Sequence, residues 1–473
     1  MRVRWGNVLK QNNYYDVVII GAGMSGLAAG IRLAYYDKKV LICEQHGVLG
    51  GLNSYYQRAG RLLDVGLHAM TNYVSKKERL APLNKLVRQL KLKWEDFCLV
   101  PQNHSVIHFP DSKLTFSNDP ELLMEEIQKK FPSQIDGYNR LVKYIYNYDA
   151  FSLGNSSYRS ARKVMSEFID EPLLIEMLLC PLMYYGSAWE NDMDFSQFCI
   201  MFRSIYLEGF ARPIDGVTRI IDLLKEKYLA CNGDLRFGCE IKKIMLKNDE
   251  AVGVKLGNGQ EIICGKIISS AGLHETEKLL GRKITKEGTL PGELAFFEVI
   301  LCLKNYLSDD DYKSTIMFYN NSKKFKYRKS DDFVSLDSGV ICSPDNFEYG
   351  DGKRTQPILR LTNIANYEKW NKCSREDYKK KKDEWLDRII DNAASMVPIK
   401  KENIDFVDMF TPTTVRKFTG HINGAVYGSP HKIKDGATSV KNLYICGTDQ
   451  GFLGIVGSML SGVSMANVHC LQE

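Results

Sequence analysis

Three glycines near the start of the chain have the spacing of a phosphate-binding loop. The stretch "VVIIGAGMSGLAAG" contains G-x-G-x-x-G at Gly21, Gly23 and Gly26. The first glycine permits a tight turn, the second lets the backbone approach a pyrophosphate, and the third lets the next helix pack closely. N–H groups at the start of that helix face the phosphate charge. The residues that we expect to contact a dinucleotide here are Gly21, Ala22, Gly23, Met24, Ser25 and Gly26.

An acidic residue about twenty positions later makes this interpretation stronger. Glu44 ends the apolar stretch "VLICE", and a carboxylate at that place binds ribose hydroxyls. The same carboxylate repels a 2′-phosphate, so NADP is disfavoured. NAD and FAD both fit this pattern, and it does not separate them. A dinucleotide fold that binds nothing is the minor alternative.

The elements around these residues form an α/β unit. Residues 15–20, "YDVVII", are apolar and β-branched, which is typical of a strand buried on both faces. A turn and helix follow in "GAGMSGLAAGIRLAYYD", and "KKVLICEQ" predicts a second, parallel strand. The alternation of helices and strands returns later in the chain. It consists of a helix from about Val217, a hairpin turning at Asn258-Gly259, and a strand ending at Ala271-Gly272.

The remaining segments have a different character. Residues 76–200 show charged helical patterns with few β-branched runs, and we interpret them as a helical insertion. Residues 285–430 mix strands with one highly charged helix, "REDYKKKKDEWLDRIIDNAASM". Its lysine run is most simply a solvated helix face, and a membrane-surface patch is the minor alternative.

Composition limits the classes of function. The 473 residues are 44% hydrophobic and 25% charged, with a formal charge of +6, which indicates a globular chain of about two units. The twelve cysteines include no CxxC pair, so we expect neither a metal site nor a redox dithiol. No secretory signal or membrane-spanning stretch is evident. We expect a cytoplasmic protein, peripheral to a membrane at most, that does not bind nucleic acid.

The segment after Glu44 separates the two cofactors. "GVLGGLNSYYQRAGRLLDVGLHAM" places Gly50-Gly51 before a D-x-G-x-H stretch that ends at His68. It resembles the FAD-dependent amine oxidase superfamily, most closely the branch of phytoene desaturases, carotenoid isomerases and retinol saturases. The resemblance implies that the paired glycines follow the FAD pyrophosphate and ribitol, and that the D-x-G stretch reaches the isoalloxazine. The residues implied in FAD binding here are Gln45, Gly50, Gly51, Leu52, Asn53, Gly66, Leu67 and His68.

The C-terminal segment resembles the second FAD element of that superfamily. In "NLYICGTDQGFLGIVGSMLSG" a strand ends at Gly447, and the resemblance implies that Asp449 binds ribitol or pyrophosphate. A helix beginning near Gly457-Ser458-Met459 is expected to point N–H groups at the flavin. The resemblance also implies that the strand containing Ile241 contacts the adenine with its backbone. The further residues implied are Ile241, Ala271 and Gly272.

One residue departs from the superfamily pattern. Leu52 stands where an Arg or Lys usually follows the paired glycines, and Arg58 and Arg61 are the candidates to replace that charge.

The resemblance also implies a domain organisation. We predict an α/β fold with a GR2-like, Rossmann-type FAD-binding domain formed by residues 1–75, 210–284 and 431–473. A mixed α+β substrate domain, with a helical and membrane-facing lid, is predicted for residues 76–209 and 285–430. Aromatic and methionine residues of the insertion are typical of a core when taken alone, whereas the resemblance implies that they roof a tunnel for an apolar lipid.

The leading hypothesis is a desaturase that acts on C–C bonds of a polyene, isoprenoid or other long lipid by hydride transfer to flavin N5. The candidate catalytic residues are His68, Arg416 and His421, each of which also has a bracing role as its alternative. No second nucleotide motif appears, so oxygen or a quinone is the expected electron partner. The alternatives are a redox-neutral isomerase or a saturase of the same lipid, an amine oxidase, and a silent FAD-binding scaffold.

Overall fold

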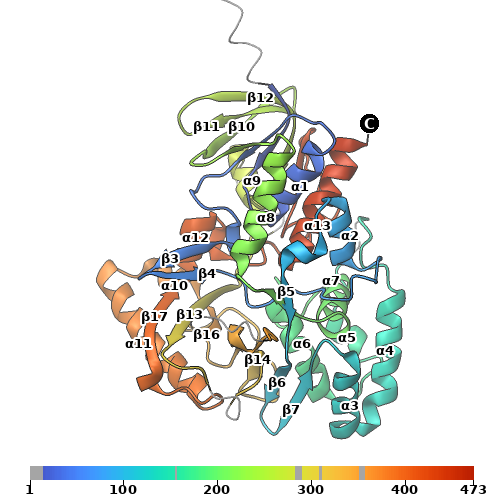
Figure 1. Ribbon diagram of the computed structural model, residues 1–473, viewed down its shortest axis with the longest axis vertical. Coiled ribbons are helices and arrows are strands. Elements are labelled where there is room, and N and C mark those ends of the chain that lie inside the picture. The colour runs from blue at the N-terminus through green and yellow to red at the C-terminus, as the bar shows by residue number, and fades with distance from the viewer. Residues whose placement is uncertain (1–13, 155–156, 283–289, 308–311, 351–356, 473) are drawn as a thin grey trace, which may run out of the picture.

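The computed structural model describes residues 14–154, 157–282, 290–307, 312–350 and 357–472. The N-terminal residues 1–13, which bear on the absence of a secretory signal, lie outside these ranges. Two seven-stranded sheets dominate the described chain. The first sheet lies at the top of Figure 1 and the second lies below it.

The first sheet has the order β10-β11-β12-β1-β2-β9, with β18 also paired to β12. Strands β12, β1, β2, β9 and β18 pair in parallel, whereas β10, β11 and β12 form an antiparallel meander. Its strands are β1 (Tyr14–Ile20), β2 (Val40–Cys43), β9 (Asp234–Arg236), β10 (Ile241–Lys247), β11 (Glu250–Leu256), β12 (Glu261–Ser269) and β18 (Leu443–Ile445).

Strand β1 is buried on both faces because its side chains alternate between two cores. Val17 and Ile19 pack in the cluster formed with the covering helices. Val18 and Ile20 pack in the cluster on the other face, with residues of β10 and β11. A continuous run of apolar residues is what a central parallel strand requires, so the strand expected over 15–20 is confirmed.

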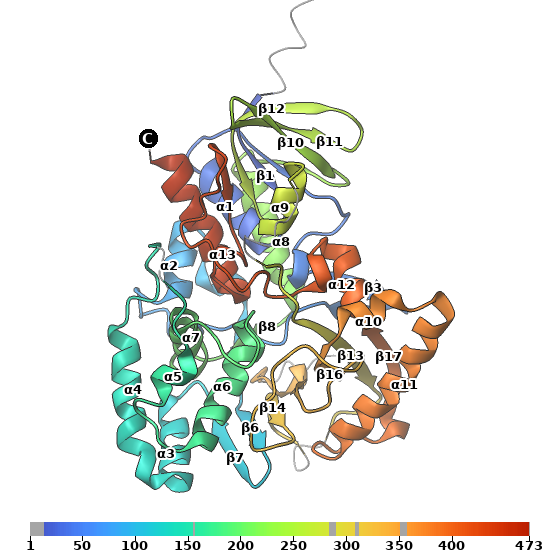
Figure 2. The ribbon, with the colours of Figure 1, turned by 180° about the vertical axis from the view of Figure 1, so that it is seen from behind.

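Helices α1 (Met24–Ala34), α8 (Val217–Ala230) and α13 (Gly454–Ala466) cover one face of this sheet. Figure 2 shows α1 and α13 side by side, although they come from opposite ends of the chain. A Cβ on Gly462 would lie 2.0 Å from the carbonyl oxygen of Ser25, so only glycine lets the helices approach this closely. This crossing brings the two predicted cofactor elements together.

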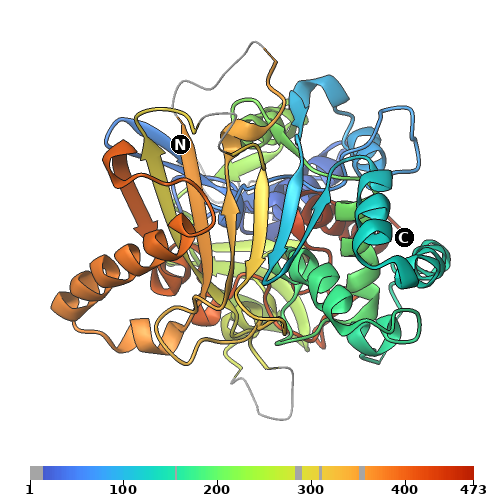
Figure 3. The ribbon, with the colours of Figure 1, turned by 90° about the horizontal axis from the view of Figure 1, so that it is seen from below.

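The second sheet has the order β17-β13-β16-β15-β14-β6-β7, as Figure 3 shows from below. Its pairs are antiparallel except β14 with β6. Its strands are β6 (Ser105–Phe109), β7 (Ser112–Phe116), β13 (Ala295–Leu303), β14 (Ile316–Asn320), β15 (Ser338–Cys342), β16 (Ile358–Ala365) and β17 (Ile404–Phe410). The short pairs β3 (Tyr55–Arg58) with β4 (Arg61–Asp64), and β5 (Leu99–Pro101) with β8 (Ala211–Pro213), complete the strands.

Helices pack against both sides of the second sheet. Odd-numbered residues of β13 face the core that includes Trp385 of α11 (Arg375–Ala394). The insertion packs in the largest core, with residues of α6 (Pro172–Gly186) and α7 (Phe195–Phe202). The other helices are α2 (Pro82–Gln89), α3 (Pro120–Lys130), α4 (Ile135–Asn147), α5 (Ala161–Met165), α9 (Leu273–Leu279), α10 (Tyr367–Lys372) and α12 (Pro412–Thr419).

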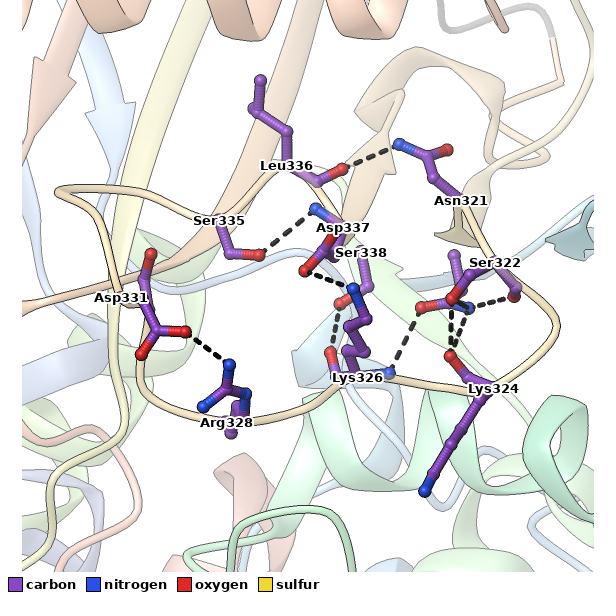
Figure 4. Close-up of polar contacts among 12 residues, drawn as sticks. Asn321, Ser322, Lys324, Lys326, Arg328, Asp331, Ser335, Leu336, Asp337 and Ser338 are labelled. Atoms are coloured by element: carbon purple, nitrogen blue, oxygen red, sulfur yellow. Dashed lines mark hydrogen bonds and ion pairs between the residues drawn. The ribbon is translucent and has the colours of Figure 1, made fainter.

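The loop between β14 and β15 is held by its own polar contacts, drawn in Figure 4. The Asn321 amide donates to the Leu336 carbonyl at 2.7 Å, and Lys326 pairs with Asp337 at 3.3 Å. The loop also contacts the insertion, because the Phe325 N–H donates to Glu176 at 3.3 Å. This contact fixes the insertion against the second sheet.

Two expectations about these elements are wrong. Residues 76–200 are not helical throughout, because β5, β6 and β7 lie within them and two of these strands extend the second sheet. The C-terminal helix begins at Gly454, not near Gly457, because Leu453 still has extended backbone. The predicted division into two domains stays a prediction.

One segment has the length and composition of a membrane span. Residues Gly454–Leu471 form a helical stretch of mean hydropathy 1.2, and half of it is buried inside the protein. The stretch packs against α1 and α2. Its apolar character therefore has an explanation in core packing.

Candidate cofactor and active site

A cleft of about 1060 Å³ opens between the first sheet and the segment formed by β17 and α12. It exceeds the usual volume of a small-ligand site, about 300 to 1,000 Å³. Many of the predicted residues line it. They are Gly21, Gly23, Met24, Ser25, Glu44, Gln45, Gly50, Gly51, Leu52, Asn53, Ile241, Ala271, Arg416, His421, Gly447 and Ser458.

The three glycines of the first loop are glycine for different structural reasons. Gly21 has a φ of +89°, which favours glycine, and a Cβ on Gly26 would lie 2.1 Å from the Gly21 carbonyl oxygen. A Cβ on Gly23 would meet no protein atom within 4 Å, although Gly23 lines the cleft. The fold thus requires glycine at 21 and 26, whereas the space at Gly23 fits a bound group.

The second glycine loop lies directly against the first. The Gly50 N–H donates to the Ala22 carbonyl at 2.9 Å. Gly50 and Gly51 have φ angles of +105° and +59°, and a Cβ on Gly51 would lie 3.5 Å from the Cα of Gly23. This packing brings the paired glycines beside the phosphate-binding loop, as the sequence predicts.

Glu44 fixes the same loop with its carboxylate. Its Oε2 accepts a hydrogen bond from the Ala22 N–H at 2.8 Å, and its Oε1 accepts one from the His46 N–H at 2.9 Å. The residue is 7% exposed and lines the cleft. Because each carboxylate oxygen has two lone pairs, Glu44 still has acceptors for two ribose hydroxyls.

Two helices that line this cleft, α1 at Gly23 and α13 at Ser458, begin without side-chain caps. The N-cap residues are Gly23 of α1 and Leu453 of α13, and neither first turn contains an acidic residue. Their orphan N–H groups suit negative charge. Gly447 contacts both helices, since a Cβ there would lie 2.8 Å from the Ser25 hydroxyl of α1 and its N–H donates to the Ser461 hydroxyl of α13 at 2.7 Å. An elongated dinucleotide with an anionic middle fits these residues.

Asp449 accepts two backbone hydrogen bonds behind the cleft wall. It is 2% exposed and does not line the cleft. Its Oδ2 accepts from the Leu273 N–H at 2.6 Å and its Oδ1 from the Ser429 N–H at 2.7 Å. Asp449 therefore braces two loops, and its predicted contact with ribitol or pyrophosphate stays a prediction.

Other predicted residues also lie behind the cleft wall. Ala22, Leu67 and Met459 are buried in the core shared by α1 and α13. Gly66 packs against Leu52, since a Cβ there would lie 2.4 Å from the Leu52 carbonyl oxygen. The predicted residues outside the cleft lining are Ala22, Gly26, Gly66, Leu67, His68, Gly272, Asp449, Gly457 and Met459.

His68 belongs to a buried polar cluster beneath the D-x-G-x-H stretch. Its Nε2 lies 2.9 Å from the Thr362 hydroxyl and 3.4 Å from Oε1 of Glu298. Its side chain is 18% exposed, and burial lowers the pKa of His68 below the ordinary value. A neutral imidazole in this place can position Glu298 and Thr362. Its predicted contact with the flavin stays a prediction.

Arg360 of β16 and Arg212 of β8 hold the D-x-G-x-H stretch. The Arg360 guanidinium donates to the carbonyls of Asp64 and Val65 and to Glu298 Oε1, the last at 2.7 Å. Arg212 pairs with the Asp64 carboxylate and donates to the Leu67 carbonyl at 2.7 Å. Burial raises the pKa of Glu298, but the charges of Arg360 and His68 and the hydrogen bonds from His68 and Thr362 together outweigh it, so the pKa lies below its ordinary value.

The two other catalytic candidates line the cleft but have partners of their own. Arg416 of α12 donates to the Tyr367 hydroxyl and lies over that ring at 5.4 Å. His421 has its Nδ1 3.9 Å from Glu275 Oε1. The structure therefore brings Arg416 and His421 to one wall, and His68 is not part of it.

The structure distinguishes between the two arginines that could supply the positive charge missing at Leu52. Arg58 lines the cleft, is 62% exposed at its side chain and pairs with Asp408 at 3.2 Å. Arg61 does not line it and pairs with Asp405 instead. Of the two candidates, only Arg58 can supply charge to a bound cofactor.

Several residues that line the cleft were not predicted from the sequence. Ser270 lines the cleft, and its hydroxyl donates to the Ile20 carbonyl at 2.8 Å. Its position directly after the parallel strand β12 is a sequence signal that could have indicated a cofactor contact. Tyr56 donates to Asp408 at 2.7 Å, and burial raises the pKa of Tyr56. Lys382 comes from the lysine run of α11 and reaches the Met409 carbonyl at 2.7 Å. The contacts of Tyr56 and Lys382 arise only when the second sheet closes the cleft.

Known proteins with the same pattern match most of the chain. The family model described as flavin containing amine oxidoreductase matches residues 24–468. All-trans-retinol 13,14-reductase of Danio rerio is 23% identical, over 96% of this chain and 85% of its own length. Chloroplastic prolycopene isomerase of Arabidopsis thaliana is 24% identical, over 96% and 82%.

Solved structures show the same fold at lower identity. An oxidoreductase from Methanosarcina mazei has a TM-score of 0.66 at 16% identity, over 95% of this chain and 99% of its own. Wild-type putrescine oxidase bound to putrescine has a TM-score of 0.61 at 14% identity, over 97% and 99%. The glycine loops, the acidic residue after β2 and the uncapped helices thus occur in the expected fold. The chain belongs to the flavin-containing amine oxidoreductase family, and its cofactor is FAD.

Proposed function

We propose that this protein is an FAD-dependent enzyme that acts on carbon–carbon double bonds of an elongated apolar polyene. One observation carries the proposal. Relatives named for reactions of retinol and prolycopene align with 94 to 97% of the chain, and many of the predicted FAD-binding residues line one cleft. Bound FAD supplies two-electron chemistry.

The chain's own residues supply binding, orientation and shielding from water. Glu44 and the glycine loops hold the adenosine diphosphate half of the cofactor, and Ser458 of α13 lines the same cleft. The buried contacts of Arg360 and Arg212 fix the D-x-G-x-H stretch. Arg416 and His421 are the cleft-lining candidates for contact with cofactor or substrate.

The direction of reaction is a finer proposal. Desaturation is the leading hypothesis from the sequence, whereas the named relatives are reductases and isomerases. We therefore place saturation and cis–trans isomerisation ahead of desaturation. For saturation the polyene gains a hydride and a proton. For desaturation it loses both, and oxygen or a quinone accepts the electrons.

Two other classes have less support. Amine oxidation is supported by the family description. Putrescine oxidase is only 14% identical, so its similarity shows the fold alone. A silent FAD-binding scaffold fits the same cleft. Peripheral contact with a membrane is proposed at the insertion, where Tyr146 and Tyr158 are 60% and 44% exposed.

An anaerobic flavin spectrum tests the proposal. The FAD-loaded protein is mixed with all-trans-retinol or a cis-carotenoid, first oxidised and then photoreduced. Reoxidation of the reduced flavin with loss of one polyene double bond indicates a saturase, and bleaching of the oxidised flavin indicates a desaturase. Isomerised product without net flavin change indicates an isomerase. Oxidation of putrescine with no effect of either polyene would overturn the proposal, and so would an inert flavin.

A further inference from the structure

One compact segment, residues 411–424, lies along the cofactor cleft between the two sheets, and we call it the strap. It consists of α12 and the turn that follows. Most residues from Thr414 to Ile422 line the cleft. The turn starts at Gly420, which caps α12 at a φ of +80°. It returns to the start of the helix, since a Cβ on Gly424 would lie 2.2 Å from the Pro412 carbonyl oxygen.

Two hydrogen bonds fix the strap to elements of the second sheet. The Tyr378 hydroxyl of α11 lies 2.8 Å from the Thr411 hydroxyl, at the start of the strap. The Asn423 amide, near its end, donates to the carbonyl of Gly292, shortly before β13, at 3.1 Å. Both ends of the strap are therefore anchored on the same side of the cleft.

The opposite side of the strap reaches α9, which follows β12 of the first sheet. Glu275 Oε1 accepts a hydrogen bond from the Ile422 N–H at 2.7 Å and lies 3.9 Å from Nδ1 of His421. The Glu275 side chain is 16% exposed and lines the cleft. Because a hydrogen bond to a carboxylate is stronger than one between neutral groups, Glu275 makes the main polar contact across the cleft.

Weaker contacts of the strap surround the same cleft. The ring centroids of Phe418 and His46 lie 5.8 Å apart, and a Cβ on Gly420 would lie 3.8 Å from Nε2 of Gln45. Helix α12 also packs against η1 (Gly51–Asn53), the turn of the paired glycines. The strap thus touches the loop after β2, the paired-glycine turn and α9, which all line the cleft.

We propose that the strap closes over bound FAD and that Glu275 is the positioning residue that latches it. A carboxylate beside a pyrophosphate is unfavourable through charge repulsion, so its contact with the strap explains its place in this cleft. Breaking the latch releases the strap on one side only, and an open strap lets FAD enter and leave faster. The inference concerns the cofactor and goes beyond the proposed function, because it holds for any substrate.

Rapid-mixing kinetics of FAD binding test the inference without turnover. Flavin fluorescence reports association of FAD with the cofactor-free chain and release of FAD after dilution. Glu275→Ala removes the acceptor, so both rate constants should rise, that of release by about 10-fold or more. A residue that only contacts FAD changes release alone, and one that only supports the fold lowers thermal stability and changes neither rate. Either of these results would overturn the inference.

Two further variants on α9 separate the latch from simple charge. Glu275→Gln keeps a carbonyl oxygen for the Ile422 N–H, so its rate constants should lie between those of Glu275→Ala and the wild type. Slower release in both variants would mean that Glu275 repels the phosphates and would refute the latch. Glu277 pairs with Arg282 at 3.6 Å and does not line the cleft, so Glu277→Ala is the control and should change neither rate.

Phe418→Ala gives a second test if Glu275→Ala does not fold. Phe418 is 54% exposed, so its removal costs little packing, and its contact with His46 also joins the strap to the loop after β2. Both rate constants should rise by about 2- to 10-fold. An association rate equal to that of the wild type would show that the strap does not close the cleft.

Discussion

The carboxylate of Glu44 and the backbone N–H of Ala22 are joined by a hydrogen bond of 2.8 Å. The acid after the second strand therefore holds the glycine loop in shape before any ribose is bound. Its other oxygen accepts from the His46 N–H at 2.9 Å. Glu44 thus has two roles, one in the loop and one at the nucleotide.

Replacing Glu44 with alanine should weaken FAD binding. The change removes the loop contact and the predicted ribose contacts, so we expect the FAD dissociation constant to rise at least about 10-fold. Flavin fluorescence on titration measures it. Glu250→Ala, at a surface pair with Lys441, is the control and should leave the constant unchanged. Wild-type affinity in Glu44→Ala would contradict the assignment of this loop.

Two glycine variants separate cofactor binding from folding. Gly23→Ala places a methyl group in open space, so thermal stability without FAD should stay near wild type while FAD affinity falls. Gly26→Ala forces a methyl group to 2.1 Å from the Gly21 carbonyl oxygen and should cost about 1 to 3 kcal/mol of folding free energy. Denaturant unfolding and FAD titration measure the two effects. Equal behaviour of the variants would refute the distinction.

The buried pair of Glu298 and Arg360 should matter more for stability than a surface pair. Both side chains are at most 3% exposed and lie 2.7 Å apart. Glu298→Ala leaves the arginine charge buried without its main partner, and we expect a loss of about 3 to 5 kcal/mol. Arg61→Ala breaks the more exposed pair with Asp405 and should cost below about 1 kcal/mol. Similar losses in urea unfolding would show that the cluster around His68 is not structural.

His68 should give the protein a specific pH dependence. Because burial lowers its pKa, the unfolded chain binds the proton before the folded one as pH falls below about 6.5. The free energy of unfolding therefore decreases toward acid, by up to about 1.4 kcal/mol per pH unit for one proton. His68→Gln should flatten the slope between about pH 6.5 and 5 in urea titrations. An unchanged slope would mean that His68 is protonated in the folded state.

The sequence by itself determined the first sheet and a dinucleotide site, and its resemblance to the family implied FAD. The β-branched run at 15–20, the glycine spacing and Glu44 act through local backbone geometry and burial on both faces, which a linear pattern records. The helix from Val217 and the turn at Asn258-Gly259 were predicted for the same reason and are confirmed. The start of α13 was placed too late, because its glycines gave no clear N-cap signal.

Only the tertiary structure decided what lies opposite the glycine loops. Strands β6 and β7 join the second sheet through pairing with a segment more than 200 residues away, which no local pattern records. The same long-range packing turns Asp449 toward backbone N–H groups and His68 toward Glu298. It also brings the carboxylate of Glu275 to the backbone N–H of Ile422. Local sequence fixes which residues can form a turn, a strand or a cap, whereas the partners of a buried polar group depend on which distant segments pack against it.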